Sequence, residues 1–146
     1  KNGAHLFVAN ANRNSVSVID TATGRTAETL VAELQPEAAP GNTPNSLALS
    51  PDEERLFVAN ANINTVAVFE VEKIGHSRSL GFIPVGWYPT SVRVTPDGKK
   101  LLVANAKGII SKPNRNGPVP NRAGVPGLTE YIGGLFQGTV AVIDLR

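Results

Sequence analysis

The sequence contains no cysteine and no methionine, and it has only two histidines and one tryptophan. Without cysteine, disulfides and thiolate metal sites are excluded, although the cellular compartment stays open. His5 and His76 have no cluster of acidic residues or histidines around them in the sequence, so we expect no metal site. No apolar run approaches the length of a membrane-spanning helix, and we expect no membrane span.

Common enzyme motifs are missing as well. The sequence has no Gly-x-Ser-x-Gly nucleophile turn, no Gly-x-x-x-x-Gly-Lys-Ser/Thr phosphate loop and no His-Glu-x-x-His zinc motif. We therefore predict no catalytic residue and no cofactor for these residues. The net charge of +2, from 14 basic and 12 acidic residues, favours no particular partner by itself.

What the sequence does contain is a repeat. The stretch LFVANANRNSVSVID, which starts at Leu6, recurs as LFVANANINTVAVFE from Leu56, with 10 of 15 positions identical. SLALSPDEERLFVAN, which starts at Ser46, recurs as SVRVTPDGKKLLVAN from Ser91. Self-similarity at this period indicates one supersecondary unit repeated along the chain.

Each unit is predicted to hold four strands. The segments Leu6–Ala9, Leu56–Ala59 and Leu101–Ala104 are apolar at every position, which is typical of a strand covered on both faces. Ser15–Asp20 and Thr139–Asp144 are rich in β-branched residues, as expected of the neighbouring strand. A Pro-Asp turn precedes the apolar strand in the second and third copies, and an Asn-rich turn follows it in the first two copies.

A four-stranded antiparallel sheet repeated at this interval is typical of a β-propeller blade. We therefore predict an all-β fold over residues 1–146, a β-propeller fragment of about two and a half four-stranded antiparallel blades, with no helix. The predicted parts are an incomplete blade over 1–34, a full blade over 45–85, and an incomplete blade over 90–146 with a long insertion at 107–138. Closed propellers need roughly four to eight blades, so we expect the remainder of the propeller to be the first partner of these residues.

The repeat resembles a known family. PDEER followed by LFVANANINTVAVFE resembles the β-propeller repeat named YVTN for its Tyr-Val-Thr-Asn signature, with Phe57 or Leu102 in place of the tyrosine and alanine in place of the threonine. A second stretch, GWYPTSVRVTPDGKKLLVANAKGI, is followed by SKPNRNGPVP and later by YIGGLFQGTVAVID. This order is similar to the N-terminal propeller of bacterial two-domain proteins whose C-terminal part is a phosphoesterase of the alkaline-phosphatase superfamily, and the similarity lies mainly in residues 86–144.

These resemblances imply a function. They lead us to expect a non-catalytic propeller module for binding or docking, with a C-terminal phosphoesterase domain as partner, in a protein exported to the periplasm or the cell surface. An alternative is a propeller enzyme of the lactonase or oxidoreductase type, with its site at the rim formed by the 86–89 loop and the 107–138 insertion. The few titratable groups at this rim include Lys107, Arg115 and Glu130.

Loop geometry predicts where a ligand would bind. Because strand direction alternates within a blade, Gly41–Pro44, Gly86–Pro89, the Asn-rich turns and residues 107–138 are expected on one rim, and the Pro-Asp turns on the other. Trp87 and Tyr88 either pack over their own blade or stack on a ligand. The asparagines and aspartates of the turns are expected to bind backbone groups.

The insertion at 107–138 is long and basic, with four basic residues and one acid. We expect Tyr131, Leu135 and Phe136 to anchor it, and its cations to face a companion domain or an anionic ligand, whereas a solvated flexible loop fits its composition equally well. Four cations without interleaved aromatics do not favour a nucleic-acid partner. The predicted ligand- or partner-binding residues are Trp87, Tyr88, Asn105, Lys107, Lys112, Arg115 and Arg122.

Overall fold

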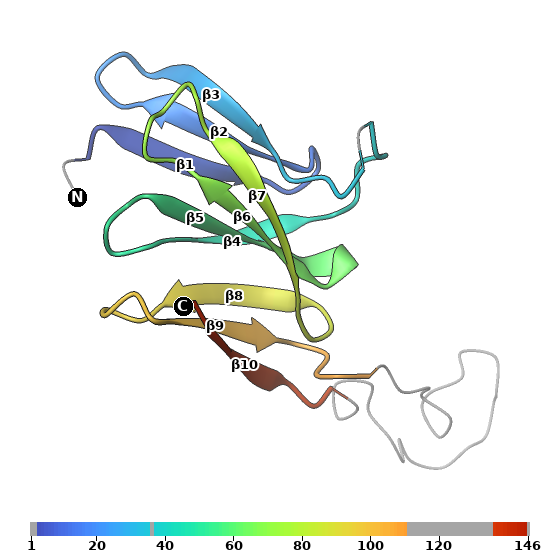
Figure 1. The fold of residues 1–146 in the computed structure, drawn as a ribbon. Helices are drawn as coiled ribbons and strands as arrows, with labels where there is room; N and C mark the ends of the chain where they lie inside the picture. Colours follow the sequence, from blue (N-terminus) through green and yellow to red (C-terminus); the bar gives the residue numbers. More distant parts are fainter. Residues whose placement is uncertain (1–2, 36, 111–135, 146) are drawn as a thin grey trace, which may run out of the picture.

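The computed structural model describes residues 3–35, 37–110 and 136–145, which form ten strands in three antiparallel sheets (Figure 1). The first sheet contains β1 (His5–Asn10), β2 (Ser15–Asp20) and β3 (Arg25–Val31). The second contains β4 (Pro44–Leu49), β5 (Arg55–Asn60), β6 (Thr65–Glu70) and β7 (Arg78–Pro84). The third contains β8 (Pro89–Val94), β9 (Lys100–Asn105) and β10 (Thr139–Asp144).

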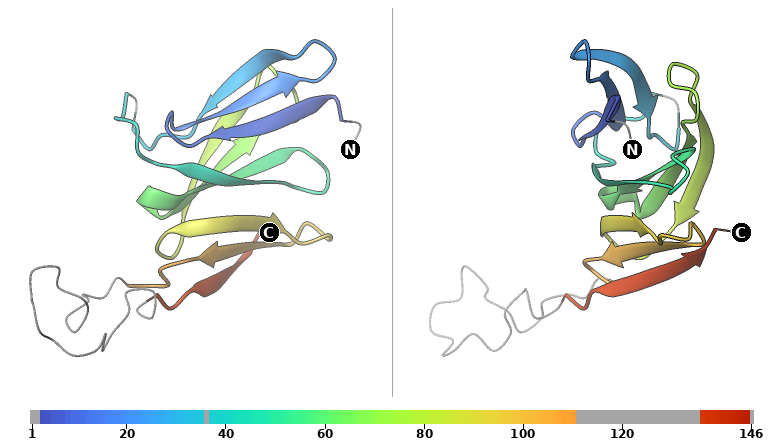
Figure 2. Two further views of the ribbon diagram at one scale, coloured as in Figure 1. Left: turned by 180° about the vertical axis from the view of Figure 1, so that it is seen from behind. Right: turned by 90° about the vertical axis from the view of Figure 1, so that its left-hand side faces the viewer.

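Within each sheet, strands that follow one another in the chain are neighbours in space, and the three sheets are stacked one on the next (Figures 1 and 2). This meander and stacking confirm the predicted all-β fold of partial propeller blades. A short 3-10 helix, η1 (Ala61–Ile63), occupies the Asn-rich turn after β5, where we expected no helix. Among the described residues, no helix has the length and apolar character needed to cross a membrane.

Strand β5 joins the three sheets. Leu56 and Val58 pack in a cluster with residues of the first sheet, whereas Phe57 and Ala59 pack in a second cluster with residues of the third sheet. Successive side chains of a strand point to opposite faces, so a strand buried on both faces must be apolar at every position. All four side chains are at most 1% exposed, which confirms the prediction for this strand.

The same apolar pattern does not give the same burial in the outer sheets. In β1, Leu6 is 54% exposed, and in β9 Leu102 and Ala104 are only partly buried. The expectation that these strands are covered on both faces is therefore wrong for the described residues. The physical reason is that, within the described residues, the first and third sheets each pack against a neighbouring sheet on one face only.

Strand register places the loops on two rims. Pro44 pairs with Asn60 at the end of the second sheet where β4 begins, and in the third sheet Pro89 pairs with Asn105, which pairs with Thr139. The loops before β4 and β8 therefore lie at the same end of their sheets as the turns after β5 and β9. This confirms that the described loops lie together on one rim, as predicted. We call it the binding rim after the ligand binding predicted there, which stays a prediction.

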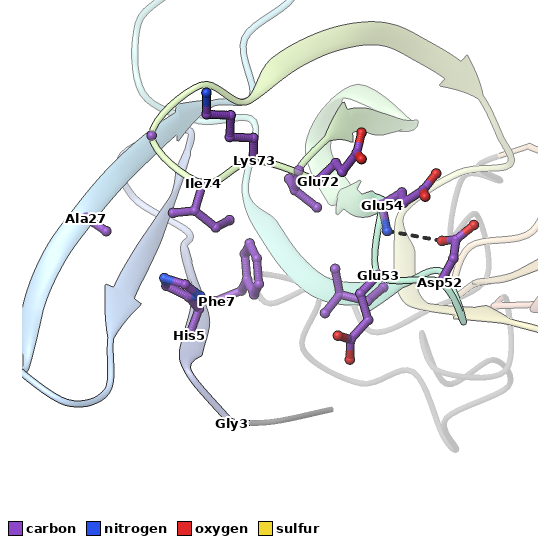
Figure 3. Close-up of a pocket in the computed structure, with 13 residues that line it drawn as sticks. Gly3, His5, Phe7, Ala27, Asp52, Glu53, Glu54, Glu72, Lys73 and Ile74 are labelled. Carbon is purple, nitrogen blue, oxygen red and sulfur yellow. Dashed lines mark hydrogen bonds between the residues drawn. The ribbon is translucent and has the colours of Figure 1, made fainter.

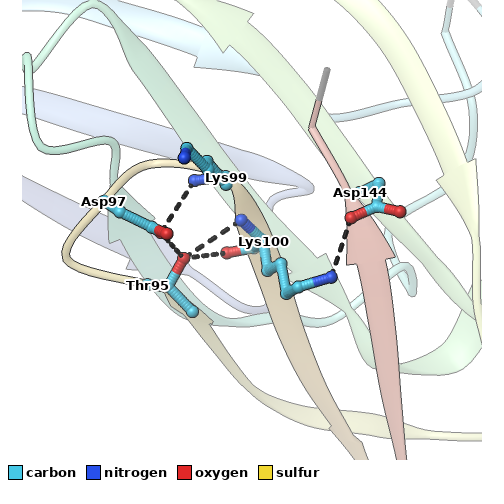
Figure 4. Close-up of polar contacts among 5 residues, drawn as sticks. All are labelled: Thr95, Asp97, Lys99, Lys100 and Asp144. Atoms are coloured by element: carbon cyan, nitrogen blue, oxygen red, sulfur yellow. Dashed lines mark hydrogen bonds and ion pairs between the residues drawn. The ribbon is translucent and has the colours of Figure 1, made fainter.

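The Pro-Asp turns lie at the other rim, which we call the turn rim. In the third sheet, the Asp97 carboxylate accepts hydrogen bonds from the Thr95 hydroxyl and from Lys99 N at 3.1 Å (Figure 4). These two hydrogen bonds, the stronger from Thr95, lower the pKa of Asp97. Next to the turn, Lys100 Nζ lies 2.9 Å from Asp144 Oδ1 and ties β9 to β10. Asp97 thus binds the backbone of its own turn, as predicted.

A carboxylate clamps the first sheet to the second on the turn rim. Glu28 of β3 accepts hydrogen bonds from Gly75 N at 2.9 Å, Ser77 N at 3.0 Å and Ser77 Oγ at 2.7 Å. Partial burial acts to raise the pKa of Glu28, but the hydrogen bonds from Ser77 and Gly75 outweigh it, so the pKa is lowered.

The clamp makes a testable contribution to the pH dependence of stability. A carboxyl whose pKa is lower in the folded state stabilises the fold above its unfolded pKa, about 4.3 for glutamate, and this stabilisation is lost as the pH falls through the folded pKa. We expect Glu28→Gln to flatten the fall in melting temperature between about pH 6 and about pH 3. Glu54→Gln is the control, and an unchanged slope in Glu28→Gln would contradict the clamp.

The outer face of the third sheet predicts self-association of the isolated 146-residue chain. Val140 and Val142 of β10 are 65% and 60% exposed, side by side on the face turned away from the second sheet. Bare apolar sheet faces and free strand edges drive association. We expect Val140→Lys/Val142→Lys to shift the chain toward monomer in analytical ultracentrifugation, and the control Thr26→Lys/Ser79→Lys on β3 and β7 to leave association unchanged. Equal effects of the two double variants would refute this interface.

Candidate functional site

The binding rim of the third sheet is built from two loops held together by backbone hydrogen bonds. Trp87 N donates to Gly108 O at 2.7 Å, Lys107 N donates to Trp87 O at 3.1 Å, and Ala106 N donates to Tyr88 O at 2.9 Å. The loop before β8 and the turn after β9 therefore form one unit, which we call the 86–108 clasp (residues 86–88 and 106–108).

Two glycines make this close approach possible. A Cβ atom on Gly86 would lie 2.7 Å from Gly108 O and 2.8 Å from the Cγ atom of Asn105. Gly108 has a φ of +70°, and a Cβ there would lie 2.1 Å from Gln137 O. Neither position accepts a side chain without moving backbone, so the clasp requires glycine at both.

The second sheet repeats two of these three backbone hydrogen bonds. Ala61 N donates to Thr43 O at 3.0 Å, and Asn62 N donates to Asn42 O at 3.1 Å. Thr43 and Tyr88, which both precede a proline, have left-handed φ values of 55° and 59°. Such values are unusual for these residue types, and they occur at the same position of both loops. The backbone of the clasp is therefore a property of the repeat.

An asparagine of the preceding sheet holds each loop in place. Asn64, itself left-handed with a φ of 55°, accepts a hydrogen bond from Tyr88 N at 2.9 Å. Its counterpart Asn14 accepts hydrogen bonds from Gly41 N at 3.0 Å and Asn42 N at 2.8 Å. The predicted structural role of the turn asparagines is confirmed for these two residues, and each one links neighbouring sheets.

The side chains on the two loops differ, although their backbones agree. In the second sheet, Asn42 is 7% exposed and Asn62 Nδ2 donates to Gly41 O and Thr43 Oγ1, both at 2.8 Å. At the corresponding places of the third sheet, Trp87 is 42% exposed and Lys107 holds its ammonium group 4.6 Å from the centre of the Tyr88 ring. Of these two described loops, the one in the third sheet combines an exposed aromatic ring with a cation at these positions.

Asn105 lies beneath the clasp and is 2% exposed. Its Nδ2 atom donates to Val103 O and to Thr139 Oγ1, both at 3.4 Å, and its Oδ1 atom has no hydrogen-bond partner among the described residues. Asn60 occupies the same place in the second sheet, and its Oδ1 atom is also unpaired within the described part of the chain. This feature again belongs to the repeat.

The structure brings together four of the predicted binding residues, namely Trp87, Tyr88, Asn105 and Lys107. The other three, Lys112, Arg115 and Arg122, lie outside the described residues, as do Tyr131 and Leu135 of the predicted anchor. Phe136 is 50% exposed, against the expectation that it packs down. Within residues 3–35, 37–110 and 136–145, no group of three metal-ligating side chains is present.

Sequence reasoning missed a pocket of 760 Å³ on the turn rim (Figure 3). Phe7 and Ile74 line one side of it, and Asp52, Glu53 and Glu54 line the other. It lies beside β1, which ends the first sheet and has a free edge.

Stacked antiparallel meanders of three and four strands, with loops gathered on one rim, define the chain as part of a β-propeller. The family model described as "Lactonase, 7-bladed beta-propeller" matches residues 1–109, and the chain belongs to this family. This match contradicts the prediction of a non-catalytic docking module and favours the alternative of a propeller enzyme of the lactonase type. No curated protein matches the chain.

Solved structures agree with the family assignment. Candidate 6-phosphogluconolactonases from Bacteroides fragilis and Bacteroides uniformis match with TM-scores of 0.64 and 0.63 and identities of 26% and 25%, over 73% and 72% of this chain. Hydrazine synthase of Kuenenia stuttgartiensis matches with a TM-score of 0.60 and 27% identity over 71% of this chain. The matched part covers 30%, 31% and 26% of those three proteins, respectively, so the chain spans about a third of their length or less.

The asparagine that holds the clasp gives a stability prediction. We expect Asn64→Ala to lower the free energy of unfolding by about 2 kcal/mol, since it leaves Tyr88 N unpaired and forces alanine into a left-handed conformation. Asn64→Asp keeps the acceptor oxygen and is the matched control, with a loss well below that of alanine. Chemical denaturation of the complete protein measures both. Equal losses for alanine and aspartate would show that the hydrogen bond to Tyr88 contributes nothing.

Proposed function

We propose that these residues are part of a seven-bladed propeller enzyme that hydrolyses a lactone, with the substrate bound at the rim that carries the 86–108 clasp. The family match over residues 1–109 carries this proposal. The two Bacteroides structures, described as candidate 6-phosphogluconolactonases, support a sugar-derived lactone as the substrate class. The exposed ring of Trp87 and the cation of Lys107, carried on backbone segments that hydrogen-bond to each other, support the choice of rim.

The reaction adds water to the ring ester. The water oxygen bonds to the lactone carbonyl carbon, the bond between that carbon and the ring oxygen breaks, and the ring oxygen takes a proton to become a hydroxyl group. The product is a hydroxy carboxylate, and one proton is released to solution at neutral pH. The enzyme must therefore bind the ring, stabilise negative charge on the carbonyl oxygen and activate the water.

The described rim residues supply binding groups for this reaction. Trp87 and Tyr88 offer aromatic faces, and Lys107 offers a positive charge. The loops 86–88 and 105–108 contain no carboxylate and no imidazole. The proton acceptor for water is thus expected from another part of the complete propeller or from Glu130, which lies outside the described residues.

The YVTN-type repeat, a companion phosphoesterase domain and export to the periplasm or cell surface stay predictions of the sequence resemblance. A lactone-hydrolysing propeller is compatible with a second domain, because the two activities would occupy separate sites. Limited proteolysis followed by separate assays of the fragments would test whether a phosphoesterase accompanies the propeller.

Lactone hydrolysis is tested by proton release from sugar δ-lactones added to the complete protein in a pH-stat. We expect a rate above that of uncatalysed ring opening, and we expect Trp87→Ala to lower kcat/KM about tenfold with little loss of stability, as for an exposed aromatic contact. Leu80→Ala is the control, because Leu80 is similarly exposed, at 45% against 42%, but lies on β7. Ring opening at the uncatalysed rate would refute the proposed function. A large stability loss in Trp87→Ala would instead assign the residue to packing.

A further inference from the structure

Comparison of the two repeated loops distinguishes the contacts that hold the rim together from the side chains that are available to a ligand. The loops before β4 and β8 share two backbone hydrogen bonds to the turns after β5 and β9, respectively, a left-handed residue before proline and an asparagine from the preceding sheet. These shared features are the scaffold, and they need neither an aromatic ring nor a cation. Trp87 and Lys107 replace side chains that, in the second sheet, hydrogen-bond within the chain itself.

The positive charge of Lys107, in the turn after β9, is held in place and is not neutralised by an ion pair within the described residues. Lys107 Nζ lies 4.6 Å from the centre of the Tyr88 ring, within the range of a cation–π contact. The Tyr88 backbone is held from both sides, by Asn64 Oδ1 and by Ala106 N, so the ring is a stable support for the ammonium group. Within the described part of the chain, Lys107 forms no ion pair with a carboxylate.

We propose that Lys107 and Tyr88 form the recognition point for an anionic group on the substrate, a phosphate or a carboxylate, while Trp87 packs against the substrate ring. This proposal rests on the proposed lactone hydrolysis and assigns these residues to substrate discrimination. The ammonium group donates hydrogen bonds to the anion. The Tyr88 ring already restricts the Lys107 side chain, so less conformational freedom is lost when the anion binds. Lys107 and Tyr88 are specificity and positioning residues, and neither is assigned a role in bond breaking.

The test compares three lactones on the complete protein. These are a phosphorylated sugar δ-lactone, a δ-lactone with a free carboxylate, and an uncharged sugar δ-lactone. We expect Lys107→Gln to lower kcat/KM about tenfold for the charged lactones, mainly through KM, which corresponds to the loss of one hydrogen bond to a charged group. The uncharged lactone should react at an unchanged rate, and a loss on only one charged lactone identifies phosphate or carboxylate as the recognised group.

Matched variants separate charge from fold. Lys107→Arg keeps the charge and should retain the preference for charged lactones, whereas Lys73→Gln removes a cation from the turn rim and should leave all three rates unchanged. Tyr88→Phe keeps the ring face and should retain the preference for charged lactones, while Tyr88→Leu should raise KM for the charged lactones alone. Equal losses on charged and uncharged lactones in Lys107→Gln would overturn the proposal.

A binding measurement keeps this proposal distinct from the proposed function. Titration with inorganic phosphate should change a tryptophan fluorescence signal that is absent in Trp87→Phe, and Lys107→Gln should abolish the change. If phosphate binds in this way but no lactone is hydrolysed, the anion site stands and the proposed function falls. If lactones are hydrolysed with no phosphate signal and no effect of Lys107→Gln on discrimination, the anion site falls and the proposed function stands.

Discussion

Burial of both faces of β5 is the constraint on which the rest of the structure depends. Leu56 and Val58 face one neighbouring sheet, and Phe57 and Ala59 face the other, so removal of either neighbour would expose a row of apolar side chains. The free energy of burial scales with apolar area, and it is obtained here only when sheets stack. Each sheet therefore depends on the next one for its stability.

Stacking also requires polar contacts between sheets, and the repeat supplies them at fixed places. On the binding rim, Asn14 and Asn64 each accept hydrogen bonds from the loop of the next sheet, and on the turn rim Glu28 accepts three from the loop after β6. Because these contacts involve mostly loop backbone, they tolerate changes in the loop side chains. Asn42 and Trp87 occupy equivalent places on loops with the same backbone for this reason.

The sequence predicted the fold better than the site or the activity. The strands and rims were predictable because they follow from local periodicity. LFVAN recurs at Leu56, and turn residues separate the apolar segments. The cation–π contact of Lys107 with Tyr88 depends on hydrogen bonds between segments far apart in sequence, which no pattern indicates. The activity was predicted wrongly because missing motifs were taken to indicate no catalysis, although a propeller site can be assembled from several blades.

The position of the candidate site links recognition to packing between sheets. Tyr88 belongs to the third sheet, but its amide is held by Asn64 at the end of a turn of the second sheet. A left-handed φ of 59° is unfavourable for tyrosine, and it persists because the hydrogen bonds of Asn64 and Ala106 stabilise it. Lys107 lies over this ring, so the place of its charge depends on how the second and third sheets stack. The proposed substrate recognition at this rim would thus be coupled to the apolar contacts of Phe57 with the third sheet, which set the same stacking.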